Sequence, residues 1–171
     1  MDGLCPPRGA HWFSAWKPEE RRFTMQAKTQ RASEGENKAI SRRADEELFN
    51  RGNLVVADEL FAPDFVYHDP AGEELRGPEN VKGYAAMLRA AFPDLHQTIE
   101  DQIAEGDKVA YRWTARGTHE SELMGIAPTG KRVKFTGIVV ARLANGKIEE
   151  IWENYDALGM MRQLGIVPSP E

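Results

Sequence analysis

Four carboxylic acids lie close together in residues 146–165, "GKIEEIWENYDALGMMRQLG": Glu149, Glu150, Glu153 and Asp156. A carboxyl group that is buried among apolar side chains has a pKa nearer to neutral, and it can then serve as a general base. These acids are therefore the first candidates for chemistry. What decides between them is which ones face the protein interior.

The alternation of a strand separates the four acids into two groups, because successive side chains point to opposite faces of a sheet. One face would carry Glu149, Ile151, Glu153 and Tyr155, and the other Ile148, Glu150, Trp152, Asn154 and Asp156. Both faces carry large apolar groups, so alternation alone leaves open which one is inside. Asp156 also has a structural interpretation as the N-cap of a following helix, which stabilises a helix by about 1 kcal/mol.

Helical patterns come before the strands. An apolar residue at every fourth position predicts a first helix that Gly52 ends. Asn53 is placed to cap a short second helix that Pro63 stops, and a third helix is predicted from Pro78 to the residue before Pro93.

The pattern then changes to the two-residue period of strands. The predicted strands are 64–69, 95–106, 108–119, 132–144 and 147–157, followed by a last helical segment, 157–165. Asn145-Gly146 between the last two strands is a strong hairpin signal. Helices followed by an antiparallel meander indicate an α+β fold.

Size and charge limit the possible classes of protein. The chain has 171 residues, which suits one domain, and a net charge of −5 without a clustered basic face, so we expect no nucleic-acid partner. A single cysteine, Cys5, and histidines without helical spacing predict no disulfide and no metal site. No apolar run reaches about 18 residues, and we expect a cytoplasmic protein without a membrane partner.

The N-terminal residues differ from the rest in composition. Residues 1–35 are predicted to be a flexible extension, and residues 36–168 a single domain. Met25 is a possible alternative start. Four aromatic residues in the extension could instead dock on an apolar surface: Trp12, Phe13, Trp16 and Phe23.

Several motifs in residues 37–166 resemble the SnoaL-like polyketide cyclase (ester cyclase) family of the nuclear-transport-factor-2-like (NTF2-like) superfamily. They are "LFAPDFVYHDPAG", "FPDLHQTIED", "GTHESELMGIAPTGKRVKFTGI" and "GKIEEIWENYDALGMMRQLG". The resemblance implies a cone-shaped α+β fold, in which a curved, mainly antiparallel sheet wraps three helices around an internal pocket. It also implies a homodimer or homotetramer that associates through the sheet.

The resemblance also nominates a catalytic residue. Cyclases of this family have an aspartate as general acid/base on the last strand, and the Gly146 turn aligns that aspartate with Glu153. The family's assisting histidine and glutamine fall at Val139 and Gly137, which have no polar side chain. The implied reaction needs no cofactor: proton abstraction from a carbon between two carbonyls, then aldol ring closure.

Other residues are candidates for binding the substrate. His68, His119 and Tyr155 could donate hydrogen bonds to an enolate oxygen. Each also has a structural interpretation: a turn at His68, loop backbone groups at His119, and packing at Tyr155. Trp113 and Tyr84 could line a pocket for a flat substrate or could be ordinary core residues.

Fold alone does not determine function, so three hypotheses stay open. The first is a cofactor-free cyclase that acts on a small hydrophobic carbonyl compound. The second is a small-molecule-binding module without catalysis, which the lost polar groups at Val139 and Gly137 favour. The third is a hydroxylase-type or isomerase-type relative.

Overall fold

The computed structural model describes residues 33–70, 72 and 74–168. Its helical elements are α1 (Glu34–Asp45), the π-helical turn η1 (Glu46–Asn50), α2 (Val56–Leu60), α3 (Pro78–Ala91) and α4 (Ala157–Leu164). Its strands are β1 (Phe61–His68), β2 (Glu74–Arg76), β3 (His96–Glu105), β4 (Lys108–Thr118), β5 (Arg132–Ala144) and β6 (Lys147–Tyr155). The predicted extension 1–35 lies outside the described residues except for its last three.

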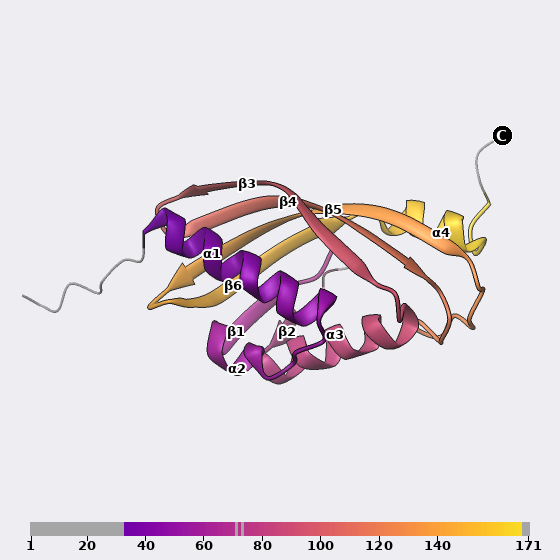
Figure 1. The fold of residues 1–171 in the computed structure, drawn as a ribbon, viewed down its shortest axis with the longest axis horizontal. Helices are drawn as coiled ribbons and strands as arrows, with labels where there is room; N and C mark the ends of the chain where they lie inside the picture. Colours follow the sequence, from indigo (N-terminus) through magenta and orange to yellow (C-terminus); the bar gives the residue numbers. More distant parts are fainter. Residues whose placement is uncertain (1–32, 71, 73, 169–171) are drawn as a thin grey trace, which may run out of the picture.

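The six strands form one curved sheet in the order β2-β1-β6-β5-β4-β3. Only the pair β1 and β6 is parallel, and all other neighbours are antiparallel. Helices α1, α2 and α3 lie on one side of the sheet, and α4 packs at the far end beside β5 (Figure 1). The predicted α+β fold with a mainly antiparallel sheet around helices is confirmed.

Local sequence signals account for most element boundaries. Pro78 begins α3, Asp156 caps α4 by accepting a hydrogen bond from Gly159 N at 2.8 Å, and Asn145-Gly146 turns between β5 and β6 with positive φ at both residues. Asn53 is not an N-cap, which corrects the prediction: its side chain donates to Glu47, while α2 begins later at Val56.

The first helix begins earlier than its apolar stripe. Ser33 and Glu36 form a reciprocal capping box at its N-terminus. Its buried face is partly polar, because Asn37, Ser41 and Asp45 lie at successive four-residue steps beside the apolar stripe. The helix then widens into η1, and such π turns are often found at functional sites.

A β-bulge in β6 breaks the strict alternation assumed from the sequence. The register with β5 pairs Arg142 with Glu150 but Leu143 with Ile148, so Glu149 is the extra residue. Ile148 therefore turns inward with Ile151, although simple alternation places them on opposite faces. After the bulge, Ile151, Glu153 and Tyr155 share the inner face.

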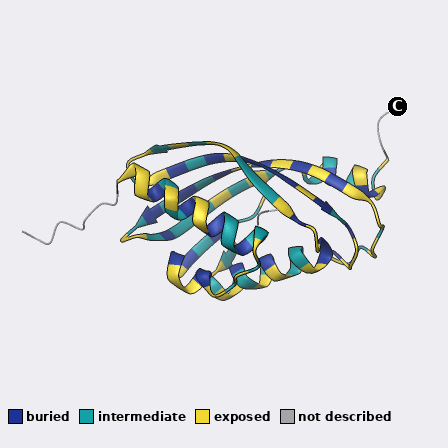
Figure 2. Cartoon of the chain, viewed as in Figure 1, coloured by how far each residue is buried: buried dark blue, intermediate teal, exposed yellow. Residues whose placement is uncertain are grey.

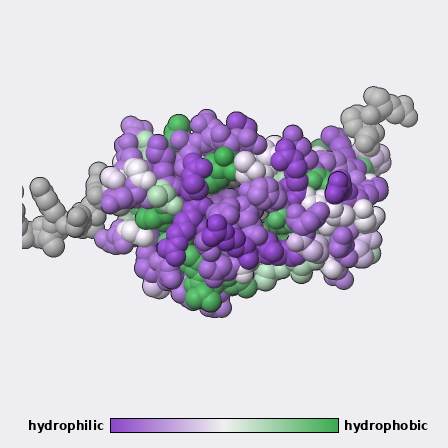
Figure 3. Space-filling model, in the orientation of Figure 1, coloured by the Kyte–Doolittle hydropathy of each residue, from purple (hydrophilic) through white to green (hydrophobic). Residues whose placement is uncertain are grey.

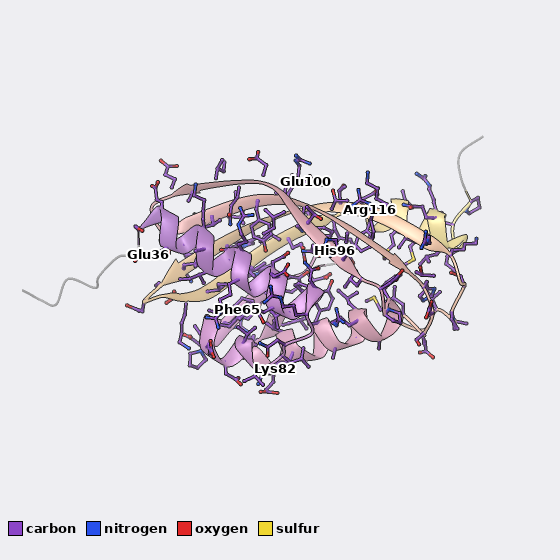
Figure 4. The ribbon with its side chains drawn as sticks, in the orientation of Figure 1. Glu36, Phe65, Lys82, His96, Glu100 and Arg116 are labelled. Atoms are coloured by element: carbon purple, nitrogen blue, oxygen red, sulfur yellow. The ribbon has the colours of Figure 1, made fainter. Side chains whose placement is uncertain are left out.

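The core lies between the helices and the inner face of the sheet. Buried positions alternate along β4 and β5 and follow the sheet-facing sides of the helices (Figure 2). Phe65, which is fully buried, lies in this layer, whereas Glu100 and Lys82 point outward (Figure 4). The face seen in Figure 3 is mostly hydrophilic, with apolar side chains in small groups.

None of the helices described is both long and apolar enough to cross a membrane.

Candidate functional site

A cavity lies between the inner face of the sheet and helices α1 and α3. Apolar side chains form most of its lining. The polar groups in the lining are Ser41, Asp45, Tyr67, Tyr84, Gln97, Tyr111, Trp113, Glu153 and Tyr155. Both helical and sheet elements therefore contribute polar atoms to an otherwise apolar space, which is the usual character of a small-molecule site.

The register of the sheet explains how the inner side chains meet. Tyr111 on β4 pairs with Val139 on β5, which pairs with Glu153 on β6, so these three side chains form one row across the sheet. The next row consists of Trp113, Gly137 and Tyr155. Residues that face each other across antiparallel strands share a face, so both rows line the cavity.

Glu153 is the acid of β6 that borders the cavity. Its carboxylate accepts a hydrogen bond of 2.6 Å from the Tyr67 hydroxyl. Burial raises the pKa of Glu153 to about 6, while the hydrogen bond from Tyr67 acts in the opposite direction. The residue is only partly shielded because it borders the cavity, yet protein atoms surround its carboxyl closely enough to desolvate it.

Trp113 reaches Glu153 across a glycine. A Cβ on Gly137 would lie 2.4 Å from the Trp113 ring, so only glycine leaves room for the indole there. The indole N–H faces the Glu153 carboxyl and lowers its pKa, but it stands outside hydrogen-bond geometry and has no partner in the described chain. Trp113 thus occupies the space that a side chain at position 137 would take.

A second buried carboxyl, Asp45, lines the cavity from the end of α1. It is 4% exposed and accepts a hydrogen bond of 2.7 Å from Gln97 Nε2. Burial, with a smaller contribution from the charge of Glu153, raises the pKa of Asp45 to about 7. Sequence reasoning missed Asp45. The available signal was the recurrence of polar residues at four-residue steps, at Asn37, Ser41 and Asp45.

The structure brings together four of the six predicted site residues. Glu153, Trp113, Tyr84 and Tyr155 line the cavity. Burial raises the pKa of the Tyr84 and Tyr155 hydroxyl groups, so both phenols stay protonated and able to donate at neutral pH. The role of these residues in binding stays a prediction.

The two predicted histidines lie elsewhere. His68 is at the end of β1, where its Nε2 is 2.9 Å from Glu150 and its ring stacks on Trp152. His119 is fully buried, and its Nδ1 accepts from Thr129 N at 3.2 Å, so its proton lies on Nε2. Neither is among the cavity-lining residues.

The outer face of β6 has a different character. Glu150 accepts a hydrogen bond of 3.0 Å from Arg142 Nε in addition to its contact with His68. The hydrogen bond with His68 and the pairing with Arg142 hold the pKa of Glu150 below its usual value. This acid therefore stays ionised and serves as a structural partner of a cation.

The cavity is thus equipped for proton transfer. Glu153 can take a proton near neutral pH, and the phenols and the indole N–H can donate to an oxygen that gains negative charge. Across the described residues, no group of three or more His, Cys, Asp or Glu side chains is arranged to hold a metal ion.

Comparison with known proteins identifies the family. The profile of the family described as SnoaL-like polyketide cyclase matches residues 39–164. Aklanonic acid methyl ester cyclase DnrD of Streptomyces peucetius is 34% identical over 115 residues, which cover 66% of this chain and 77% of that protein. Nogalonic acid methyl ester cyclase of Streptomyces nogalater is 31% identical over 121 residues, covering 68% of this chain and 89% of the relative.

A solved structure with the same fold is AclR of Streptomyces galilaeus, a candidate hydroxylase. It superposes with a TM-score of 0.72 at 31% identity, over 81% of this chain and 87% of AclR. Both the extent of the family match and the identity to curated relatives are sufficient to assign the family. This chain belongs to the SnoaL-like polyketide cyclase family.

Proposed function

We propose that this protein closes a ring in a polyketide-type carbonyl compound, with Glu153 as the general base of an intramolecular aldol reaction. The observation that carries the proposal is the position of Glu153 in the cavity with a pKa raised to about 6. A base with a pKa near the working pH combines a useful ionised fraction with useful proton affinity.

The reaction follows from the groups around Glu153. Its carboxylate removes a proton from the carbon between two carbonyls, and the enolate carbon attacks a ketone of the same molecule. The buried N–H of Trp113 and the hydroxyl of Tyr155 support the proposal, because both border the cavity and could stabilise an oxygen that gains charge. Chemistry of this kind requires no cofactor.

The test is ring closure of aklanonic acid methyl ester and nogalonic acid methyl ester, the compounds named for the relatives. We expect turnover by the wild type and a loss of at least ~100-fold in kcat for Glu153→Gln. The matched control is Glu150→Gln, the same substitution on the outer face, which should stay within a few fold of wild type. Equal rates for wild type and Glu153→Gln would remove Glu153 from the mechanism.

Binding without turnover is the second candidate function. It is favoured by Gly137 and Val139, which place no polar side chain beside Glu153. Native mass spectrometry would then detect a small carbonyl compound that leaves unchanged.

The likeness to AclR adds hydroxylation to the activities to assay, and formation of an oxygenated product in place of a ring-closed one would refute the cyclase proposal.

The outer face of the sheet is the proposed surface for a homodimer or homotetramer. Ile138 and Ile103 are exposed there at 55% and 67%, and Trp152 is on the same face at 36%. Light scattering should report a dimer or larger for the wild type and a smaller species for Ile138→Asp. A wild-type monomer would refute this assembly. The cytoplasmic location stays a prediction.

A further inference from the structure

Asp45 is a buried carboxyl that the proposed mechanism does not use. It is the last residue of α1, is 4% exposed and lines the cavity. Its hydrogen-bond partner is a neutral amide, Gln97, and it forms no ion pair with any described residue. A buried acid without a cationic partner is costly for folding, which suggests that it has a role besides stability.

The two inner acids enter the cavity from different walls. Glu153 belongs to β6 in the middle of the sheet, whereas Asp45 comes from α1, which packs over β3 and β4. The pKa of Tyr111 is raised by burial and then by the charges of both acids, which places its ring near each of them. The other charged groups that act on Asp45 are Arg42 and Glu46 of its own helical segment.

A further donor lies beside Glu153 in the same cavity. The N–H of Trp113 is buried, lines the same cavity and has no protein partner within the described residues. Its ring is 3% exposed and is held in place against Gly137. A buried donor of this kind is normally satisfied, so it is available either to the Glu153 carboxyl that it faces or to an oxygen atom of a molecule bound beside that carboxyl.

We propose that Asp45 is a second catalytic carboxyl, which protonates the oxygen of the acceptor carbonyl while Glu153 removes the proton from carbon. This inference rests on the proposed function. The Glu153 carboxylate takes the C–H proton, and the enolate carbon forms the new C–C bond to the acceptor carbon. The π electron pair of the acceptor carbonyl moves to its oxygen, which takes the proton of Asp45. The proton on Glu153 then returns to Asp45 through water, so the substrate is isomerised and nothing is consumed.

The two acids have the protonation states that this division requires. With a pKa of about 6, Glu153 is mostly ionised at neutral pH, and with a pKa of about 7, Asp45 is protonated in a large fraction of molecules. Pairs of acids whose surroundings separate their pKa values are a recurrent basis for assigning base and acid roles.

The experiment separates proton removal from ring closure. The first probe is aklanonic acid methyl ester, on which closure is measured. The second is a β-keto methyl ester fragment without the acceptor ketone, on which deuterium uptake above the enzyme-free rate is measured in D2O. We expect Asp45→Asn to lose at least ~100-fold in kcat for closure and to keep exchange within a few fold of wild type. Glu153→Gln should lose both.

Two further variants keep the inference testable if Asp45→Asn folds poorly. Asp45→Glu retains a carboxyl and should retain part of the closure rate together with the decline in rate above pH 7, which Asp45→Asn should lack. Glu47→Gln, two residues along, outside the cavity lining and not among the charged groups that act on Asp45, should behave as wild type.

Closure by Asp45→Asn at the wild-type rate would overturn the inference. An equal loss of exchange and closure in Asp45→Asn would also overturn it, because Asp45 would then act only by holding the Glu153 site together. A wild type that catalyses neither exchange nor closure would instead refute the proposed function itself.

Discussion

Glu150 and Glu153 are the same residue type, lie three positions apart on β6 and have pKa values shifted in opposite directions. Glu153 borders the cavity, where burial raises its pKa to about 6. Glu150 lies on the outer face, where His68 and Arg142 lower its pKa. The difference comes from the neighbouring groups and not from the carboxyl itself.

The two acids have different surroundings because they lie on opposite faces of the same strand. An odd separation places the two residues on opposite faces, and the face of Glu153 is the inner one because it borders the cavity beneath the helices. On the outer face, Glu150 pairs with Arg142, contacts His68 and is partly exposed to solvent. On the inner face Glu153 borders an apolar lining, which favours a proton on the carboxyl, while the hydrogen bond from Tyr67 favours the ionised form and only partly offsets that effect.

The largest expected effect is on the pH dependence of stability and concerns Asp45, the other acid that lines the cavity. It tests whether burial, and not a feature particular to Glu153, raises the pKa of an inner acid. Its pKa rises from 3.8 unfolded to about 7 folded, so its ionisation destabilises the fold progressively as pH rises from about 4 to about 7. The full effect is at most about 4 kcal/mol above pH 7. Urea unfolding at pH 4, 5.5 and 8 should show this decline in wild type and its absence in Asp45→Asn. Parallel curves for the two proteins would contradict burial as the cause.

Gly137→Ala should disturb the packing beside Glu153 without changing either acid. The added methyl would lie 2.4 Å from the Trp113 ring, and displacing the ring costs about 1–3 kcal/mol of stability. Tryptophan fluorescence and thermal unfolding would report the change. Gly83→Ala in α3 is the control, because nothing lies within 4 Å of its added carbon, and it should stabilise the protein by up to about 1 kcal/mol.

Neutralising the two compared acids should change stability in opposite directions. Glu153→Gln removes a group whose raised pKa destabilises the fold progressively from pH 4.5 to about pH 6, so it should stabilise by up to about 2 kcal/mol at pH 8. Glu150 has a lowered pKa, so its contribution is present above pH 4.5 and is lost in acid. Glu150→Gln should therefore destabilise by up to about 1 kcal/mol at neutral pH, a limit set by solvent screening. The same sign in chemical unfolding of both variants would refute the comparison.

The smallest effect is expected at Asp156, the acid that follows the strand and acts as a cap. Asp156→Ala removes the hydrogen bond to Gly159 N and should cost about 1 kcal/mol. Asp156→Asn, which can still cap the helix, should retain nearly all of the stability. A loss of ligand binding in Asp156→Ala, without a loss of stability, would show that the cap is not its task.

Local patterns predicted much of this fold because the signals were themselves local. The strand 132–144 was placed with the bounds observed for β5, and the helix that starts at Pro78 and the cap at Asp156 were also confirmed. The parallel pairing of β1 with β6 had no such signal, since it joins segments far apart in the chain. The bulge at Glu149 lies in the β5–β6 hairpin, where strict alternation was assumed, and no glycine or other residue type marks the extra position.

The candidate site was less accessible from sequence than the fold. Asp45 lies on a helix whose apolar stripe drew attention to Ala44 and Leu48, and its burial becomes visible only when β3 and Gln97 are in place. His68 was nominated as a hydrogen-bond donor to an enolate oxygen, yet its partner Glu150 lies on the outer face. Residue type alone does not determine which side of the sheet a group faces.

The central claim is that the inner acid of β6 is poised to exchange a proton near neutral pH while the outer one is not. Carbon-13 NMR of the glutamate carboxyl groups, assigned with Glu153→Gln and Glu150→Gln, measures both pKa values in one titration and needs no substrate. The account predicts a pKa of about 6 for Glu153 and a value below 4.5 for Glu150. A Glu153 carboxyl that titrates at or below 4.5, together with Glu150, would contradict it.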